Sequence, residues 1–203
     1  MTQDGDVRIT VTRTLSKDQQ ARRVRLVEAA RQLADEGGYV AVTMQDVADR
    51  AGVARATVYR YFASKDHLLT EVAAAWARTM TADIVLAPSA GGDGTPAQHL
   101  TDLLERIVVV AASELTLTSA IIQAVTSPDP GIEDARTELF LFVRTRLAAT
   151  MGDELPAQDD VEIVLGHVLL AALVSLTALR RPTEEVAAMV RTAARLILAG
   201  ALP

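Results

Sequence analysis

Arginine, tyrosine and threonine side chains are concentrated in one short segment of the chain. Arg55, Thr57, Tyr59, Arg60 and Tyr61 all lie within the stretch AGVARATVYRYFASKDHLL at residues 51–69. An arginine can form two hydrogen bonds with guanine, and tyrosine and threonine hydroxyls commonly contact phosphate. These residue types therefore favour a surface that faces an anionic partner such as DNA. The alternative is a small helical bundle whose surface happens to carry arginine and tyrosine.

The residues around this segment predict two short helices joined by a tight turn. Thr43 can cap a first helix over 44–51, and Val47 and Ala48 give that helix a buried face. Gly52 can adopt the left-handed conformation that ends a helix, and a second helix follows over 55–61. A long helix precedes this pair, so the arrangement is that of a helix-turn-helix domain.

A helical wheel at about 100° per residue divides the second short helix into two faces. The core face is predicted to contain Ala54, Val58, Tyr61 and Phe62, and the outward face Ala56, Tyr59 and Arg60, flanked by Arg55 and Thr57. A small residue lets the helix backbone approach base edges, and an alanine can meet a thymine methyl group. We expect Arg60 to read bases, and we expect Arg55 and the tyrosines to contact phosphate.

The remainder of the chain predicts further helices and no strands. Breakers such as Gly37-Gly38, APSAGGDGTP and SPDPG separate helix-length segments with a period of 3.6 residues. Ser16 with Gln19 and Thr95 with Gln98 form capping-box patterns. The fold class is therefore all-α, with about nine helices over 17–36, 44–51, 55–61, 65–86, 96–112, 114–126, 131–151, 158–180 and 184–199.

Composition and motifs narrow the class of protein. The chain has 203 residues, 50% of them hydrophobic, and no cysteine, which excludes disulfides and thiolate metal sites and suits a cytoplasmic location. Residues 1–65 carry 11 Lys/Arg and 8 Asp/Glu, whereas 66–203 carry 9 Arg and 18 Asp/Glu, so only the N-terminal part favours an anionic partner. We find no common catalytic or nucleotide-binding pattern. We therefore expect no enzymatic activity, catalytic residue, metal or cofactor.

The segment MQDVADRAGVARATVYRYFASKDHLL resembles the N-terminal domain of TetR-family transcriptional repressors. The shared elements are a threonine-capped helix with Val47-Ala48, then Ala51-Gly52-Val53, a helix ending in Tyr59-Arg60-Tyr61-Phe62, and Ser64-Lys65 at the start of the fourth helix. The chain departs from the family pattern at Ala54, often serine, and Ala56, often glycine. The resemblance implies that the DNA contacts are Thr43, Arg55, Thr57, Tyr59, Arg60, Tyr61 and Lys65, to which Ala56 is added.

The resemblance also implies the organisation of the whole chain. It predicts a disordered arm at 1–15, a helix-turn-helix domain at 16–63, and an effector-binding and dimerisation domain at 64–203. The expected partners are a palindromic double-stranded DNA operator, a small-molecule effector and a second copy of the chain. Helices 158–180 and 184–199 carry apolar residues on more than one face and would form the homodimer interface. The apolar run at 161–179 contains Glu162 and His167, so we interpret it as a buried helix and expect no membrane association.

The effector site is expected to be mostly apolar with few polar groups, which favours a hydrophobic or amphipathic effector, lipid- or sterol-like. The candidate pocket residues are Trp76, Gln123, Phe140, Arg144, His167 and Thr177. For Trp76 and His167, a simple place in the core is the competing interpretation. One alternative function is a DNA-binding or adaptor protein whose C-terminal domain is filled and independent of ligand. Cavity volume distinguishes these possibilities.

Overall fold

The computed structural model describes residues 16–86, 95–151 and 158–201, and this part of the chain is all-α. Three helices form an N-terminal layer, namely α1 (Lys17–Ala41), α2 (Met44–Ala51) and α3 (Arg55–Tyr59). Helix α4 (Lys65–Leu86) leaves that layer and joins α5 (Pro96–Ser113), α6 (Leu115–Val125), α7 (Glu133–Met151), α8 (Gln158–Thr177) and α9 (Thr183–Ala201). A short 3-10 helix, η1 (Pro130–Ile132), precedes α7. The all-α prediction is confirmed for the described residues.

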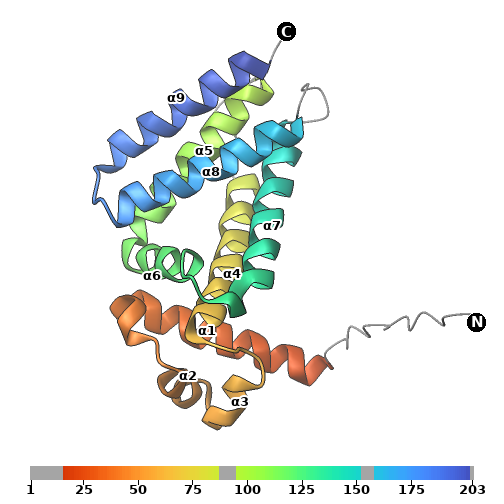
Figure 1. Cartoon of the computed structure of the whole chain (residues 1–203), viewed down its shortest axis with the longest axis vertical. Coiled ribbons are helices and arrows are strands. Elements are labelled where there is room, and N and C mark those ends of the chain that lie inside the picture. Colours follow the sequence, from red (N-terminus) through yellow and green to blue (C-terminus); the bar gives the residue numbers. More distant parts are fainter. Residues whose placement is uncertain (1–15, 87–94, 152–157, 202–203) are drawn as a thin grey trace, which may run out of the picture.

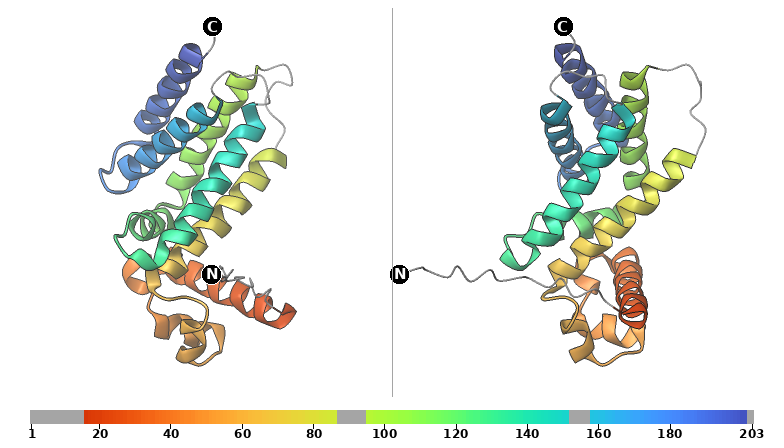
Figure 2. Two further views of the ribbon diagram at one scale, coloured as in Figure 1. Left: turned by 45° about the vertical axis from the view of Figure 1, so that its right-hand side comes forward. Right: turned by 90° about the vertical axis from the view of Figure 1, so that its right-hand side faces the viewer.

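The two layers can be followed in all three ribbon views. In Figure 1 the helices α1, α2 and α3 lie at the lower end of the molecule, and α8 and α9 lie at the upper end. The further views in Figure 2 show α4 and α7 running side by side between the two ends. Helix α6 packs against α1 and α4, so it connects the C-terminal bundle to the N-terminal layer. The 107° bend between α5 and α6 brings α6 across the bundle to this position.

Local sequence signals fix the helix starts. Ser16 and Gln19 form the capping box of α1, and Thr95 and Gln98 form that of α5, as their spacing predicted. Thr43 caps α2 by accepting a hydrogen bond from the Asp46 N–H at 3.1 Å. Helix α1 runs further than the predicted end at residue 36, because one more turn follows the break at Gly38. That glycine has φ 70° and ψ −164°, a conformation that residues with a side chain rarely adopt.

The core continues through both layers. In the N-terminal layer, Leu26, Val47, Val58 and Phe62 are buried, so the three helices enclose their own apolar centre. In the bundle the fully buried side chains come from α5 to α9, and include Leu104, Leu117, Leu147, Leu165 and Val190. Leu68 and Leu69 of α4 are fully buried as well. The N-terminal layer and the bundle therefore share α4 as a common packing element.

Helix α8 is strongly apolar, yet only part of it is buried. Within the described residues, Asp160–Thr177 is the single helical segment that by itself is long and apolar enough to cross a membrane, a criterion that core helices also meet. Only 33% of that segment is buried within the chain. The expectation of a buried helix is therefore wrong for the isolated chain, because one apolar face packs inward while another is exposed. Helix α8 also ends at Thr177 rather than at 180, and α9 continues past 199 to Ala201.

Candidate DNA-binding surface and apolar cavity

The turn between α2 and α3 has the geometry that its sequence predicts. Gly52 ends α2 in the left-handed conformation, with φ 67° and ψ 40°. The Val53 N–H then donates to the Ala48 carbonyl at 3.0 Å, which closes the turn. Val58 of α3 is fully buried and holds α3 against the other two helices. Because α3 is fixed from one side only, its opposite side is presented to solvent.

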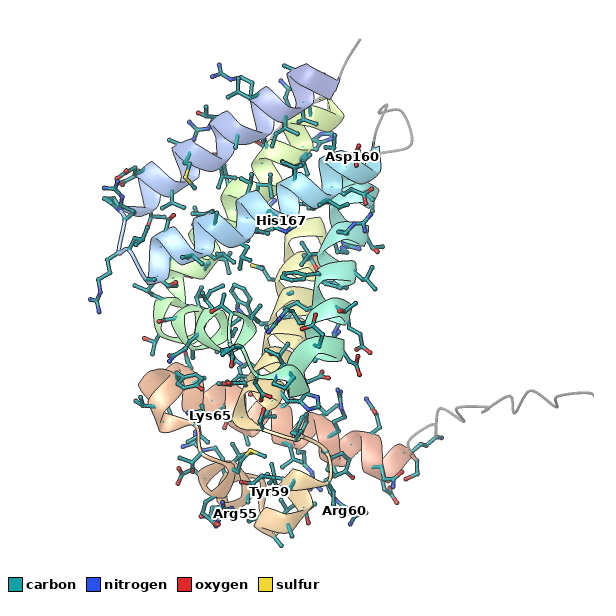
Figure 3. All side chains as sticks on the ribbon, in the orientation of Figure 1. Arg55, Tyr59, Arg60, Lys65, Asp160 and His167 are labelled. Atoms are coloured by element: carbon teal, nitrogen blue, oxygen red, sulfur yellow. The ribbon has the colours of Figure 1, made fainter. Side chains whose placement is uncertain are left out.

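The exposed side of α3 and its C-cap carry four of the predicted DNA-contacting residues. Arg55, Ala56, Tyr59 and Arg60 are exposed, and Tyr59 retains 47% of its accessible surface. The Arg55 guanidinium donates to the Tyr59 hydroxyl at 3.2 Å and lies 5.4 Å from the centroid of its ring. The labelled side chains Arg55, Tyr59 and Arg60 lie together at the lower end of the molecule (Figure 3). This end therefore presents hydrogen-bond donors on the exposed side of a short helix.

Other residues in and near α3 are less exposed than a DNA contact requires, or lie on a different face from the one that the helical wheel predicted. Thr57 and Tyr61 are half-buried, whereas Thr43 is exposed at the start of α2. The Tyr61 hydroxyl is buried and has no hydrogen-bond partner among the described residues, so a phosphate reaches it only if the side chain moves. Ala54 was predicted to be in the core, but it is exposed. It precedes the helix in an extended conformation (φ −70°, ψ 144°), where a helical wheel does not apply.

Lys65 begins α4 but is also held by the end of α1. Its ammonium donates to the Tyr39 carbonyl at 3.2 Å and lies 3.6 Å from the centroid of the Tyr39 ring. Burial lowers the pKa of Lys65, and the negative charge of Asp66 partly opposes this effect. Lys65 lies above α3 at the boundary between the two layers (Figure 3). A phosphate contact by Lys65 would therefore be sensitive to the relative position of α1 and α4.

A polar cluster surrounds this boundary, formed by Tyr39, Ser64, Asp66, Ser127 and Asp129; we call it the junction cluster. The Tyr39 hydroxyl donates to one oxygen of Asp66 at 2.6 Å, and the Ser127 hydroxyl donates to the other at 2.6 Å. The Ser64 hydroxyl donates to Asp129 at 2.6 Å and accepts from the His67 N–H at 3.1 Å. The junction cluster therefore joins the end of α1, the start of α4 and the segment between α6 and η1.

The hydrogen bonds of the junction cluster shift the pKa values of two members. Burial, together with the hydrogen bond and negative charge of Asp66, raises the pKa of Tyr39 to about 12. The hydrogen bonds from Ser64 and from the Gly131 N–H lower the pKa of Asp129. At neutral pH Tyr39 is therefore a neutral hydrogen-bond donor and Asp129 an ionised acceptor.

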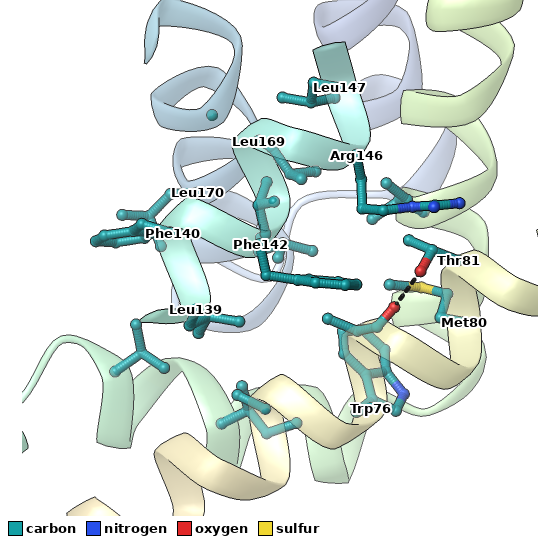
Figure 4. A pocket seen from close by; sticks show the side chains of 18 of the residues that line it. Trp76, Met80, Thr81, Leu139, Phe140, Phe142, Arg146, Leu147, Leu169 and Leu170 are labelled. Atoms are coloured by element: carbon teal, nitrogen blue, oxygen red, sulfur yellow. Dashed lines mark hydrogen bonds between the residues drawn. The ribbon is translucent and has the colours of Figure 1, made fainter. Parts of the chain in front are cut away.

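An apolar cavity lies in the bundle between α4, α5, α6, α7 and α8. Its volume is about 90 Å³. Figure 4 shows Phe142 and Arg146 extending from α7 toward α4, where Trp76, Met80 and Thr81 lie, with Phe140 on the other side of α7 near Leu170. The Trp76 indole N–H donates to Glu114, the residue between α5 and α6, so the ring is fixed at the edge of the cavity. The lining is almost entirely hydrocarbon.

The structure brings together some of the predicted pocket residues. Trp76 and Phe140 line the apolar cavity, whereas Arg144 and His167 line an adjoining space of about 90 Å³ that shares Phe140 and Gly166 with it. Gln123 is exposed on α6, and Thr177 lines a separate groove beside the α8–α9 turn. Phe142, which the sequence offers as an aromatic candidate beside Phe140, also lines the cavity, whereas sequence reasoning missed Arg146. Their spacing with Leu139, Val143 and Leu147 places all five on one face of α7, which a wheel of that helix would have revealed.

Comparison with known proteins agrees with this architecture. The family described as "Bacterial regulatory proteins, tetR family" matches residues 26–72, and the one described as "Tetracyclin repressor-like, C-terminal domain" matches residues 93–197. The chain belongs to the TetR family of bacterial transcriptional regulators. The first match covers most of α1, then α2, α3 and the start of α4, and the second covers nearly all of the bundle from α5 to α9.

Individual TetR-family proteins resemble nearly the whole chain. The transcriptional repressor KstR of Mycobacterium tuberculosis is 31% identical over 185 residues, which cover 90% of this chain and 83% of the relative. The crystal structure of a TetR regulator from Rhodococcus sp. RHA1 has a TM-score of 0.80 at 27% identity and covers 90% of this chain and 98% of that one. FadR of Thermus thermophilus, crystallised with lauroyl-CoA, has a TM-score of 0.70 at 20% identity and covers 89% of this chain and 95% of its own. At that identity the last comparison shows the shared fold alone.

Proposed function

We propose that this TetR-family regulator is a homodimeric repressor that leaves its operator when an amphipathic effector enters the apolar cavity. The observation that carries the DNA half is the exposed face of α3, where Arg55, Ala56, Tyr59 and Arg60 project from a helix anchored by the buried Val58. On this proposal Arg60 pairs with bases, and Arg55, Tyr59 and Lys65 contact phosphate. Thr43, Thr57 and Tyr61 are proposed as further contacts that set the register.

The exposed face of α8 supports the homodimer. Ile163 and Val164 keep 40% and 46% of their accessible surface, and on α9 Met189 and Leu196 keep 41% and 65%. Large apolar side chains clustered on two neighbouring helices mark an association surface. Two copies joined through α8 and α9 would present two α3 helices to one DNA duplex. A palindromic operator with half-sites about 34–36 Å apart fits such a two-fold dimer.

If an effector enters the apolar cavity, the small volume of the cavity implies a mechanism for release. Ligand sites usually measure about 300–1,000 Å³, several times the volume present here. An effector of lipid size therefore fits only if the helices that line the cavity move apart. Helix α4 is one of these helices and begins at Lys65, so its displacement moves the DNA-facing end. An effector that binds the displaced arrangement more tightly shifts the equilibrium away from the DNA-binding arrangement.

The repressors named KstR, at 31% identity, support repression as the regulatory sense. The lauroyl-CoA in the FadR structure supports an acyl compound as the effector, and a sterol-like compound is the second candidate class. We place the protein in the cytoplasm, where its DNA partner is found. On this proposal, residues 16–63 read DNA and residues 64–203 bind the effector and the second copy. The expected arm at 1–15 lies outside the described residues.

Gel-shift titrations with the DNA upstream of the protein's own gene test the proposal. The wild-type chain and an Arg60→Ala, Tyr59→Ala double variant are compared over a range of salt concentrations. We expect the variant to lose at least about tenfold in affinity, because a good base contact contributes about 1–3 kcal/mol. Arg181→Ala is the matched control, since Arg181 is exposed in the α8–α9 turn far from α3 (Figure 1). Unchanged binding by the double variant would exclude these residues as the DNA-reading surface.

A further inference from the structure

The lining of the apolar cavity contains a single charged residue. Arg146 of α7 is half-buried at its edge, and the other lining residues are apolar except Thr81. The Thr81 hydroxyl already donates to the Ala77 carbonyl at 2.8 Å, so it is not available to a ligand without breaking that bond. Figure 4 shows the stem of Arg146 beside Phe142 and its guanidinium extending over Thr81. One cation therefore stands at the mouth of an otherwise hydrocarbon space.

Arg146 differs from its neighbour Arg144 in how its charge is balanced. The Arg144 guanidinium lies 3.4 Å from Glu162, a carboxylate with 6% of its surface exposed. Among the carboxylates whose side chains the structure describes, which leaves out Asp83 and Asp159, none forms an ion pair with Arg146. Arg78 of α4 adds a second cation nearby, since its guanidinium carbon lies 6.0 Å from the centroid of the Phe142 ring. A second, exposed guanidinium therefore lies near Phe142, one of the residues that line the cavity.

A partly buried cation without a counter-ion is a favourable place for an anion. Removing a charge from water is unfavourable unless an opposite charge or hydrogen bonds compensate for it. The guanidinium fork matches the two oxygens of a carboxylate or phosphate, and such charge-assisted bonds are among the strongest in proteins. The aliphatic part of the Arg146 side chain meanwhile packs along the apolar lining. A ligand that contacts both these methylene groups and the guanidinium must therefore itself be amphipathic.

We propose that the effector is an anionic amphiphile whose apolar chain fills the cavity and whose carboxylate or phosphate pairs with Arg146. This inference rests on the proposed function, in which the cavity is the effector site. An unbranched chain fits the volume of about 90 Å³ with less displacement of helices than a fused ring system does. Arg146 thereby sets specificity for the charge of the effector, and the cavity sets specificity for its chain.

Binding of three probes tests this assignment: dodecanoate, lauroyl-CoA and the neutral dodecanol. Trp76 lines the cavity and is the only tryptophan of the chain, so its fluorescence reports occupancy, with calorimetry as a second measurement. We compare the wild-type chain with Arg146→Met, which keeps the apolar stem, Arg146→Lys, which keeps the charge, and the distant control Arg181→Met. Unfolding midpoints identify any variant that fails to fold.

We expect Arg146→Met to weaken binding of an anionic probe by about 10- to 100-fold, the range for a hydrogen bond to a charged group. Arg146→Lys should recover part of this loss, and dodecanol affinity should change in neither variant. If Arg146→Met weakens the binding of dodecanoate, the partner of Arg146 is a carboxylate. If it weakens the binding of lauroyl-CoA alone, the partner is a phosphate of the CoA. Both outcomes support the assignment.

Two results would overturn it. If Arg146→Met binds both anionic probes within twofold of wild type, or if dodecanol binds the wild type as tightly as they do, Arg146 does not select an anion. Should dodecanol nevertheless release the operator, the proposed function survives without this inference. If the wild type binds none of the probes and none of them releases DNA, both the proposed effector class and the role of Arg146 are wrong.

Discussion

Replacing Asp66 with alanine tests whether the junction cluster holds the two layers together. The Asp66 carboxylate accepts one hydrogen bond from Tyr39 of α1 and one from Ser127, which follows α6, each at 2.6 Å and partly buried. Hydrogen bonds to a charged group contribute about 1.5–3 kcal/mol each. Because both bonds are only partly buried, we use the lower value, and Asp66→Ala should lower the free energy of unfolding by about 3 kcal/mol.

Urea unfolding of single and double variants measures this loss and divides it between the two bonds. Tyr39→Phe and Ser127→Ala should each remove about 1.5 kcal/mol, and the double variant should approach Asp66→Ala. Asp49→Ala is the control, because Asp49 is an exposed carboxylate that accepts only a local bond from Gln45, at 2.8 Å. We expect that control to change stability by no more than about 0.5 kcal/mol.

The same variants connect the junction cluster to regulation. If the cluster transmits helix movement from the bundle to the DNA-facing end, Asp66→Ala should reduce the effect of an effector on operator affinity while leaving effector binding itself intact. The reasoning is refuted if Asp66→Ala and Asp49→Ala have the same stability within about 0.5 kcal/mol. It is also refuted if the effector releases DNA equally well from both.

Three further predictions follow from single positions. Gly52→Ala should destabilise the chain by about 1 kcal/mol in urea unfolding, because a residue with a side chain is strained at φ 67°. The loss should be no larger, since an added Cβ meets no atom within 4 Å. A neutral result would show that the turn relaxes. Gly166→Leu should remain folded, because the Cβ of the new side chain meets nothing within 4 Å. It should weaken effector binding in calorimetry; unchanged affinity would show that the ligand does not extend past Gly166. Above pH 10 the unfolded chain loses the Tyr39 proton while the folded chain keeps it, so the free energy of unfolding should fall as pH rises from 10 toward 12. Tyr39→Phe should remove this part of the decline. Identical pH profiles of unfolding free energy for the variant and the wild type would contradict the raised pKa.

Local features of the fold could be predicted from the sequence. The capping residues Ser16, Thr43 and Thr95 act on N–H groups three residues away, so their spacing alone determines the bond. Gly52 behaves similarly, because a left-handed residue is required wherever α2 turns into α3. The failure at Ala54 has the same physical basis: helical periodicity begins only at the first helical residue, and a boundary error of one residue moves a side chain from the core to solvent.

The sequence predicts that the cavity is apolar, but not which residues line it. Its apolar lining follows from the composition of α4 to α8, but which residues meet there depends on how these helices cross. Gln123 and Thr177 lie on helices that contribute to the bundle, yet their side chains face solvent or another groove. No spacing within α6 or α8 contains that information. Arg146 was recoverable in principle, since it shares a face of α7 with Phe142 and Leu147, but only the structure shows that this face borders a void.

The position of Lys65 makes the boundary between the layers open to chemical labelling. The chain has only two lysines, Lys17 and Lys65, and the second rests on the Tyr39 ring with a lowered pKa. A lowered pKa increases the fraction of uncharged amine, which is the form that acylating reagents attack. Mass spectrometry of the modified peptide would therefore follow one atom at the start of α4, with Lys17 as an internal reference. The protection of the Lys65 amine from acylation when DNA binds, and the change in that protection when a ligand is added, could then be measured on the same nitrogen.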